Sequence, residues 1–418
     1  MHTPTRDRVR RRPRFDPFSA EFRRDPYPVY RRLRESEPVH RTFLGVWVLT
    51  SHADIRQVLH SSSFSSEHGP RLVAARAERL GRARNARTEL LGERSLLFTD
   101  DPYHARLRGL VNRVFTSQAV AGLHPLITGV VAELLRAVDP ADGFDVITDF
   151  AAGLPVRVLC DWMALPRTLY DRVGPWTRDI WRLLDPGTMT AADFDRADEA
   201  ADQFVEALSD VLAERRCDPG PDLISGLLAA RTAGGESLTD DELVSVCVMC
   251  FVGGLETTTS LIGNGALALL RHPDQAARLR RDPSLAVAAV RETLRYDPPL
   301  QSTTRLATTD TVIGGAAIAA GDRLLLCLGA ANRDPAVFPR PDEFDLTRSG
   351  AGQLAFGHGI HRCLGALLAN AQAEIALEYL FCHLPELALI GGDVHRRENT
   401  SHVRGLTRLP VRSRCEIC

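Results

Sequence analysis

The 418-residue chain contains no lysine, so all 51 of its basic residues are arginine. Without a lysine amine the protein can form neither the phosphate-binding lysine of a P-loop nor the Schiff base of pyridoxal enzymes. Neither sign of charge is in large excess, because 53 acidic residues nearly balance the arginines and the formal net charge is -2. No strong field therefore favours nucleic acid, and we expect no nucleic-acid partner.

Long hydrophobic runs are equally scarce. The longest candidate covers 246–255, which is too short to cross a bilayer. Residues 1–15 are basic but lack an apolar core, so they predict a flexible arm and not a secretory signal. We therefore expect no membrane partner.

The nine cysteines are scattered along the chain. An odd, scattered set without a secretory signal predicts a reducing cytoplasm and no disulfide framework. Cys247 and Cys250 share a helix face and are expected to be packing residues. For Cys415 and Cys418 the sequence leaves metal binding, oxidation and a frayed tail open.

Helical patterns dominate to about residue 300, and one long helix is marked clearly. Thr239 and Glu242 have the spacing of a capping box, and the apolar pattern continues to Arg271. Such a helix is roughly 50 Å long and is expected to be the spine of one large domain. Gly253 and Gly254 in its middle cost about 2 kcal/mol against alanine, which predicts close packing or a local distortion there.

After residue 300 the pattern changes to short strands. We expect strands over 311–315 and 322–328, a helix over 363–380 and a strand pair over 406–411. The fold class is therefore mostly α with a minor β portion.

The most informative segment is FGHGIHRCLGA over 356–366. Its first two glycines allow a tight turn with positive φ. Cys363 then begins the expected 363–380 helix, whose N-terminus lowers a thiol pKa and favours a thiolate, a soft metal ligand. From spacing alone, a buried structural cysteine beside a loop is an equal alternative.

The segment resembles the haem-binding loop of the cytochrome P-450 family, F-G-x-G-x-H-x-C-x-G, at every fixed position. The resemblance implies that Cys363 is the axial ligand of the iron of haem b. It also places Phe356 and Gly357 in the haem-binding loop, with Phe356 beside the thiolate, and His361 near a haem propionate. An axial thiolate favours cleavage of the O–O bond.

A second family motif is the pair Glu292 and Arg295, three residues apart on one helix face. Alone, this spacing is typical of a surface ion pair. The resemblance implies instead a buried structural pair behind the haem loop. Glu343 stands where the family often has an arginine, so the third partner of this pair is left open.

A third motif is the sequence from Gly253 to the acid–alcohol pair Glu256 and Thr257. By spacing alone, a helix kink with a solvent-facing polar cluster is an alternative. The resemblance implies an oxygen-binding groove that includes Gly253, with Thr257 in contact with bound dioxygen and Glu256 relaying protons, so both are candidate catalytic residues.

Three further residues match positions that contact haem propionates. His104 and Arg108 resemble the family's H-x-x-x-R pair, and Arg305 resembles its other propionate arginine. The fork of a guanidinium suits a carboxylate.

The resemblance also implies a distal pocket for the substrate. Segments 65–98 and 175–195 are expected to cover its entrance, and its mostly apolar or neutral lining favours an apolar, medium-sized molecule. The candidate substrate contacts are Met249, Val252, Gln301, Thr303 and Ser401.

Taken together, the resemblance implies a cytochrome P-450 fold, with haem between the long distal helix and the cysteine-bearing helix. One domain is expected over 16–411, with a tail over 412–418. The implied protein is a cytoplasmic, soluble bacterial haem-thiolate monooxygenase that hydroxylates or otherwise oxidises a small organic molecule in natural-product biosynthesis. Two alternatives remain: a haem-thiolate enzyme for oxidative coupling or another non-insertion oxidation, and a non-enzymatic haem sensor.

Electrons are expected from NAD(P)H through a separate ferredoxin and ferredoxin reductase, since the sequence shows no flavin or iron–sulfur module. Ferredoxins are typically acidic. Exposed arginines near the cysteine loop, such as Arg106, Arg113 and Arg362, are candidates to steer one.

Overall fold

The computed structural model describes residues 15–413 except 84, 350, 385, 392, 393, 398, 399 and 401. Most of the expected basic arm and residues 414–418, with Cys415 and Cys418, lie outside the described residues. Phe15 already belongs to the packed fold, because its ring lies 5.4 Å from that of Phe22.

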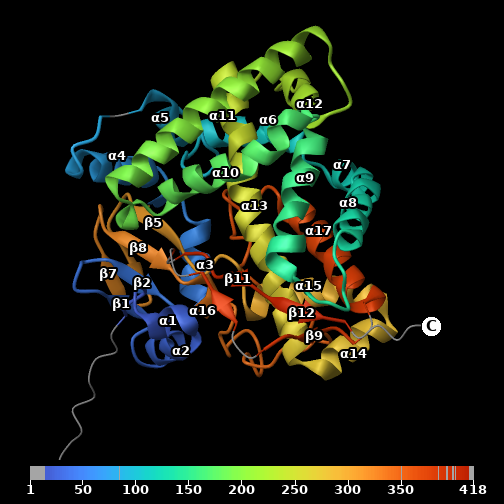
Figure 1. Cartoon of the computed structure of the whole chain (residues 1–418). Coiled ribbons are helices and arrows are strands. Elements are labelled where there is room, and N and C mark those ends of the chain that lie inside the picture. Colours follow the sequence, from blue (N-terminus) through green and yellow to red (C-terminus); the bar gives the residue numbers. More distant parts are fainter. Residues whose placement is uncertain are drawn as a thin grey trace, which may run out of the picture.

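Helices make up most of the structure, as the sequence predicts, and the strands gather at one end (Figure 1). The α-helices are α1 (Ala20–Arg24), α2 (Tyr27–Ser36), α3 (His52–His60), α4 (His68–Arg79), α5 (Ala86–Glu93), α6 (Tyr103–Asn112), α7 (Ser117–Gly122), α8 (His124–Arg136), α9 (Gly153–Trp162), α10 (Tyr170–Trp181), α11 (Ala191–Cys217), α12 (Leu223–Ala229), α13 (Asp240–Arg271), α14 (Pro273–Arg281), α15 (Ala286–Tyr296), α16 (Leu328–Ala331) and α17 (Ala366–Glu378). The strands are β1 (Val39–Arg41), β2 (Trp47–Leu49), β3 (Phe64–Ser65), β4 (Phe144–Asp145), β5 (Thr303–Ala307), β6 (Thr311–Ile313), β7 (Ala316–Ile318), β8 (Arg323–Leu326), β9 (Ala388–Leu389), β10 (His395–Arg396), β11 (Leu406–Arg408) and β12 (Pro410–Arg412).

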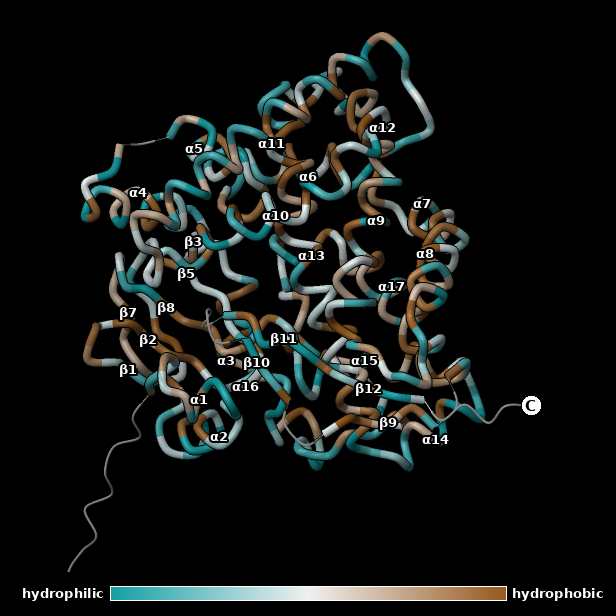
Figure 2. Tube along the Cα trace, in the orientation of Figure 1, coloured by the Kyte–Doolittle hydropathy of each residue, from teal (hydrophilic) through white to brown (hydrophobic). Residues whose placement is uncertain are grey.

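The largest sheet has the strand order β1-β2-β8-β5-β3. β2 and β8 run parallel, with Val48 opposite Leu325, whereas the other pairs are antiparallel. Hydrophobic residues gather along these strands and along the inner helices, as Figure 2 shows. The strand expected over 322–328 ends earlier, because Leu328 is the first residue of α16.

Helix α13 is the spine that the sequence predicts. Its N-cap is Thr239, and both hydrogen bonds of the capping box with Glu242 are present. The helix runs through the middle of the molecule and packs against α9, α10, α15 and α17 (Figure 1). By length and composition it could cross a membrane, but 72% of its most apolar window is buried inside the fold. It is therefore a core helix in this structure.

The helix expected over 363–380 begins later than predicted. α17 starts at Ala366, and a π-helical turn over Tyr379–His383 follows it. Cys363 belongs to the preceding loop, because its N–H donates to the carbonyl of Phe356 at 2.8 Å. The thiol is thus three positions ahead of the helix and not its first residue.

The strand pair expected over 406–411 is wrong as a pair. β11 pairs with β10, whereas β12 lies between β4 and β9. Leu409 separates the two strands, and its backbone makes hydrogen bonds with Asp145 and Val146. These bonds turn the chain from one sheet into the next.

A polar network ties the two ends of the chain to the end of α15. The hydroxyl of Tyr27 and the Nε of Arg404 both donate to Asp297 Oδ1 at 2.7 Å. Arg404 also donates to the carbonyls of Arg23 and Arg24 at 2.9 Å. Although burial opposes it, Arg404 holds the pKa of Asp297 below its usual range. The carboxylate therefore stays charged and keeps both chain ends in place.

Candidate functional site

The loop before α17 makes the turns that its glycines predict. Gly357 and Gly359 have φ values of 70° and 73°. A Cβ added at Gly359 would overlap the carbonyl oxygen of Leu59 at the end of α3. The loop thus lies directly on the α3 backbone, which fixes the position of Cys363.

Cys363 opens into a cavity of about 390 Å³. Burial raises the pKa of its thiol, while the Gly365 N–H, Arg108 and Arg362 oppose that rise. This rise is opposite to the lowered thiol pKa expected from the sequence, because Cys363 lies ahead of the helix and not at its N-terminus. A metal cation at the sulfur would remove this cost, since a coordinating thiol is deprotonated.

Two imidazoles lie close together beside this loop. The rings of His104 and His361 are 4.4 Å apart. The described residues leave both ring nitrogens of His104 and the Nε2 of His361 buried without a hydrogen bond. Asp101 and Asp100 lie at 3.6 and 3.5 Å from these nitrogens, too far for a good hydrogen bond. Burial, Arg305 and His104 lower the pKa of His361 to about 4.

Two guanidinium groups complete the cluster. Arg305 is 7% exposed, and among the described residues no carboxylate lies within ion-pair distance of it. Burial lowers its pKa to about 10. Arg108 donates its Nε to Asn112 at 3.1 Å, and burial also lowers its pKa. Buried cations without counter-charges are costly, so the cluster favours an anionic ligand.

This donor set fits haem. A single soft sulfur at Cys363 would suit the iron as a ligand, and the nearby imidazoles and guanidinium groups would suit two propionates. Among the described residues, no cluster of three or more histidine, cysteine or acidic side chains could hold a metal by itself.

One face of α13 is turned toward the cysteine loop. Cys250, Gly253 and Thr257 share this face by helical spacing. Burial raises the pKa of Cys250 to about 12, and the neighbouring Cys363 adds to the rise. Gly253 is exposed in the middle of this largely buried helix. Helix α13 continues through these residues, and Glu256 and Thr257 are half-buried.

The acid–alcohol pair on this helix has specific partners. The Thr257 hydroxyl donates to the carbonyl of Gly253 at 2.5 Å. The carboxylate of Glu256 forms an ion pair with Arg397 at 2.6 Å. No motif in the sequence indicated Arg397.

The candidate substrate contacts are more dispersed and stay predictions. Met249 is half-buried and Val252 is buried in the main core. The amide of Gln301 is engaged with the carbonyl of Pro298 at 2.8 Å. Thr303 begins β5, within 3.5 Å of Arg305 Nη1. Ser401 lies outside the described residues.

The second motif is a buried ion pair, as the family resemblance implies. Arg295 and Glu292 make two hydrogen bonds of 2.8 Å and are 2% and 4% exposed. The third partner is Arg348, whose Nε donates to Glu292 at 3.2 Å. Glu343 contributes its carbonyl to Arg295 instead of a side chain.

His68 is a further polar residue of the site that sequence reasoning missed. Its Nε2 lies 2.8 Å from the hydroxyl of Thr304, next to Arg305. Burial and Arg305 lower its pKa to about 4. No spacing in the sequence marks this histidine, because its partners come from β5.

The comparisons with known proteins agree with this site. The family model described as Cytochrome P450 matches residues 177–407. The chain is 38% identical to vitamin D(3) 25-hydroxylase of Pseudonocardia autotrophica, over 95% of this chain and 96% of that protein. It is 36% identical to 6-deoxyerythronolide B hydroxylase of Saccharopolyspora erythraea, over 94% and 97%. The crystal structure of CalO2 superposes with a TM-score of 0.89 at 37% identity, over 96% of this chain and 99% of that one.

A cysteine loop before α17, a close histidine pair and the Gly253–Thr257 hydrogen bond on α13 accompany this similarity over nearly the whole chain. The chain belongs to the cytochrome P450 family and is a haem-thiolate monooxygenase.

Proposed function

We propose that this monooxygenase hydroxylates a C–H bond of an apolar, medium-sized molecule during natural-product biosynthesis in the cytoplasm. The α13 face that carries Gly253 and Thr257 opposite the Cys363 loop is the observation that supports it most. The half-buried Met249 and the neutral Thr303 give its surroundings an apolar to neutral character. Two relatives are named for hydroxylation of vitamin D(3) and 6-deoxyerythronolide B.

Haem, when bound, supplies the activation of dioxygen. The chain's residues would hold and orient it: Cys363 would give a thiolate ligand, Arg108 and Arg305 would neutralise the propionates, and His104 and His361 would donate N–H groups to them. This pairing would supply the acceptors that the buried donors lack.

Proton delivery falls to the acid–alcohol pair. The Thr257 hydroxyl can leave the Gly253 carbonyl and donate toward the cysteine side of the helix. Glu256 lies next to it in sequence and can hold a proton that arrives from water. Replacing Thr257 by alanine should lower the amount of product formed per NAD(P)H consumed. The remaining reducing equivalents should appear as hydrogen peroxide.

The electron donor is proposed to be an acidic ferredoxin that docks at the 390 Å³ cavity beside Cys363. Three arginines, Arg108, Arg291 and Arg362, line it with one carboxylate, Glu374.

The proposed docking surface differs in part from the one suggested by the sequence. Arg113 is exposed and stays a candidate. Arg106 is already paired with the buried Glu242, so we leave it out. Changing Arg113 and Arg362 to glutamate should slow electron transfer and reverse its salt dependence. Unchanged rates would contradict this docking surface.

The deciding experiment joins spectroscopy with product analysis. Dithionite-reduced protein with carbon monoxide should show the long-wavelength Soret band of thiolate-ligated haem, and Cys363→Ala should lose it. A panel of macrolactones and sterols is then incubated with labelled dioxygen, a surrogate ferredoxin and its reductase. Label in a hydroxylated product supports the proposal. An unlabelled coupled product favours the non-insertion alternative, and absence of turnover with every donor favours a sensor.

A further inference from the structure

We propose that Arg397 is a positioning residue for proton delivery, acting through Glu256; this inference rests on the proposed function. Arg397 Nη1 lies 2.6 Å from Glu256 Oε2, and the two side chains are 22% and 12% exposed. Both side chains are therefore mostly buried but keep some contact with solvent. An ion pair in such a setting holds its carboxylate more firmly than a surface pair does.

The chain leaves Arg397 little freedom to release its partner. It directly follows β10, and its N–H donates to the carbonyl of Gly405 at 3.1 Å. At Gly405 the backbone touches α13, because an added Cβ would overlap the hydroxyl of Ser260. Ser260 is one helical turn beyond Glu256, so the segment that carries Arg397 is fixed against the helix that carries the acid.

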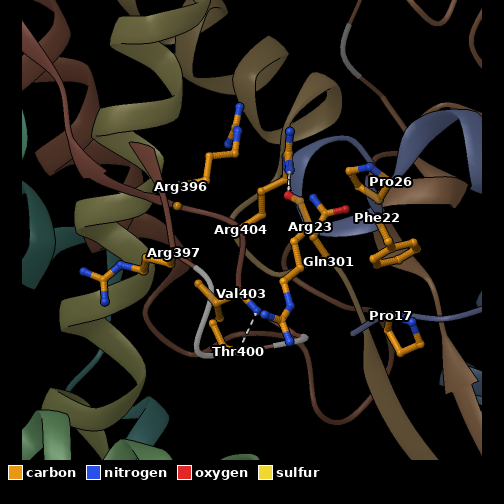
Figure 3. A pocket seen from close by; sticks show the side chains of 11 residues that line it. Pro17, Phe22, Arg23, Pro26, Gln301, Arg396, Arg397, Thr400, Val403 and Arg404 are labelled. Atoms are coloured by element: carbon orange, nitrogen blue, oxygen red, sulfur yellow. Dashed lines mark hydrogen bonds between the residues drawn. The ribbon is translucent and has the colours of Figure 1, made fainter. Parts of the chain in front are cut away.

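Neighbouring arginines do not share this role. Figure 3 shows Arg396 and Arg397 pointing in different directions, with Arg397 directed toward α13. Arg396 pairs with Asp297 at 3.0 Å, as does Arg404 at 2.7 Å. Among the described residues, Arg397 is the one cation paired with Glu256.

The chemistry of the pair assigns the two side chains different tasks. A guanidinium stays protonated in proteins and cannot pass a proton on, so Arg397 acts only through the carboxylate. It pairs with Oε2, a buried oxygen for which the described residues provide no other partner. Arg397 also lines a small pocket of about 20 Å³ between α1 and the β10–β11 segment, which gives water a place beside the guanidinium.

The test compares holoenzyme variants on the best substrate of the panel above. We expect Arg397→Gln to lower product per NAD(P)H about fivefold and raise peroxide, with KM nearly unchanged, because positioning affects proton delivery and not binding. The solvent isotope effect on turnover should increase. Arg397→Lys should restore most of the coupling, that is, the product formed per NAD(P)H consumed. Arg408→Gln, which removes a 67% exposed arginine from the adjacent strand, should leave coupling and isotope effect at the wild-type values.

A second measurement does not depend on turnover. A double-mutant cycle of Arg397→Gln and Glu256→Gln, followed by thermal unfolding, should show non-additive shifts in Tm. Additive shifts would overturn the ion pair. Non-additive shifts with unchanged coupling in Arg397→Gln would overturn the positioning role and leave the proposed function intact. A wild type that oxidises no substrate with any donor would overturn the proposed function, and this inference with it.

Discussion

Replacing Gly359 by alanine should damage the haem loop beyond the ordinary cost of a positive φ. Gly359 has φ 73°, and its added Cβ would overlap the carbonyl oxygen of Leu59, part of a backbone that cannot rotate away. Gly45 has φ 77° with nothing within 4 Å of an added Cβ. Gly45→Ala therefore measures the backbone cost alone, about 1–2 kcal/mol. In Gly359→Ala the loop must also retreat from α3 by roughly 1 Å, which adds about 1–3 kcal/mol.

The assay is urea unfolding of both variants, together with the carbon monoxide difference spectrum. Gly359→Ala should lose about 2–5 kcal/mol of unfolding free energy and much of the thiolate-type Soret band, because Cys363 moves with the loop. Gly45→Ala should keep the band. Equal losses of stability in the two variants, with the band intact in both, would refute the idea that close contact with α3 positions the cysteine.

Three other predictions concern buried charges. Arg348→Gln should cost about 1–3 kcal/mol in urea unfolding, because it leaves the buried Glu292 with one cation, whereas Arg340→Gln, at a 68% exposed side chain, should cost almost nothing. Arg305→Leu should weaken haem retention about tenfold, measured as transfer to apomyoglobin, by removing one charge-assisted bond to a propionate. His68 titrates near 4 in the fold against 6.5 in the unfolded chain, so the unfolded state binds the extra proton between these values and stability falls as the pH drops through that window. As the pH falls from 6.5 to 4, the wild type should lose about 3 kcal/mol more unfolding free energy than His68→Asn. Parallel curves of unfolding free energy against pH for the two proteins would contradict this.

The features that sequence could predict are local ones. The capping box at Thr239 and the positive φ of Gly359 follow from residues a few positions apart, and both are confirmed. The start of α17 was missed because its N-cap, Gly365, has no side chain to mark it.

Contacts between residues that are far apart in the sequence could not be predicted from motifs or spacing. Arg348 completes the pair of Glu292 from 56 positions away, and Arg397 reaches Glu256 on α13 from the segment that follows β10. Nothing in the spacing of these residues encodes their contact, because it depends on how sheets and helices pack. The residues predicted to contact propionates were assigned by family resemblance, and the structure places His68 close to one of them, Arg305.

The hydrogen bonds between Arg404 and the N-terminal segment have a consequence for the order in which the protein folds. The guanidinium bonds the Arg23 carbonyl across 381 positions of chain. Closing so long a loop in an unstructured chain costs about 5 kcal/mol in entropy, more than a few hydrogen bonds return. These hydrogen bonds can therefore form only after the intervening chain has folded. During synthesis α1 and α2 leave the ribosome first, yet the bonds of their segment to Arg404 must wait until nearly the last residues emerge.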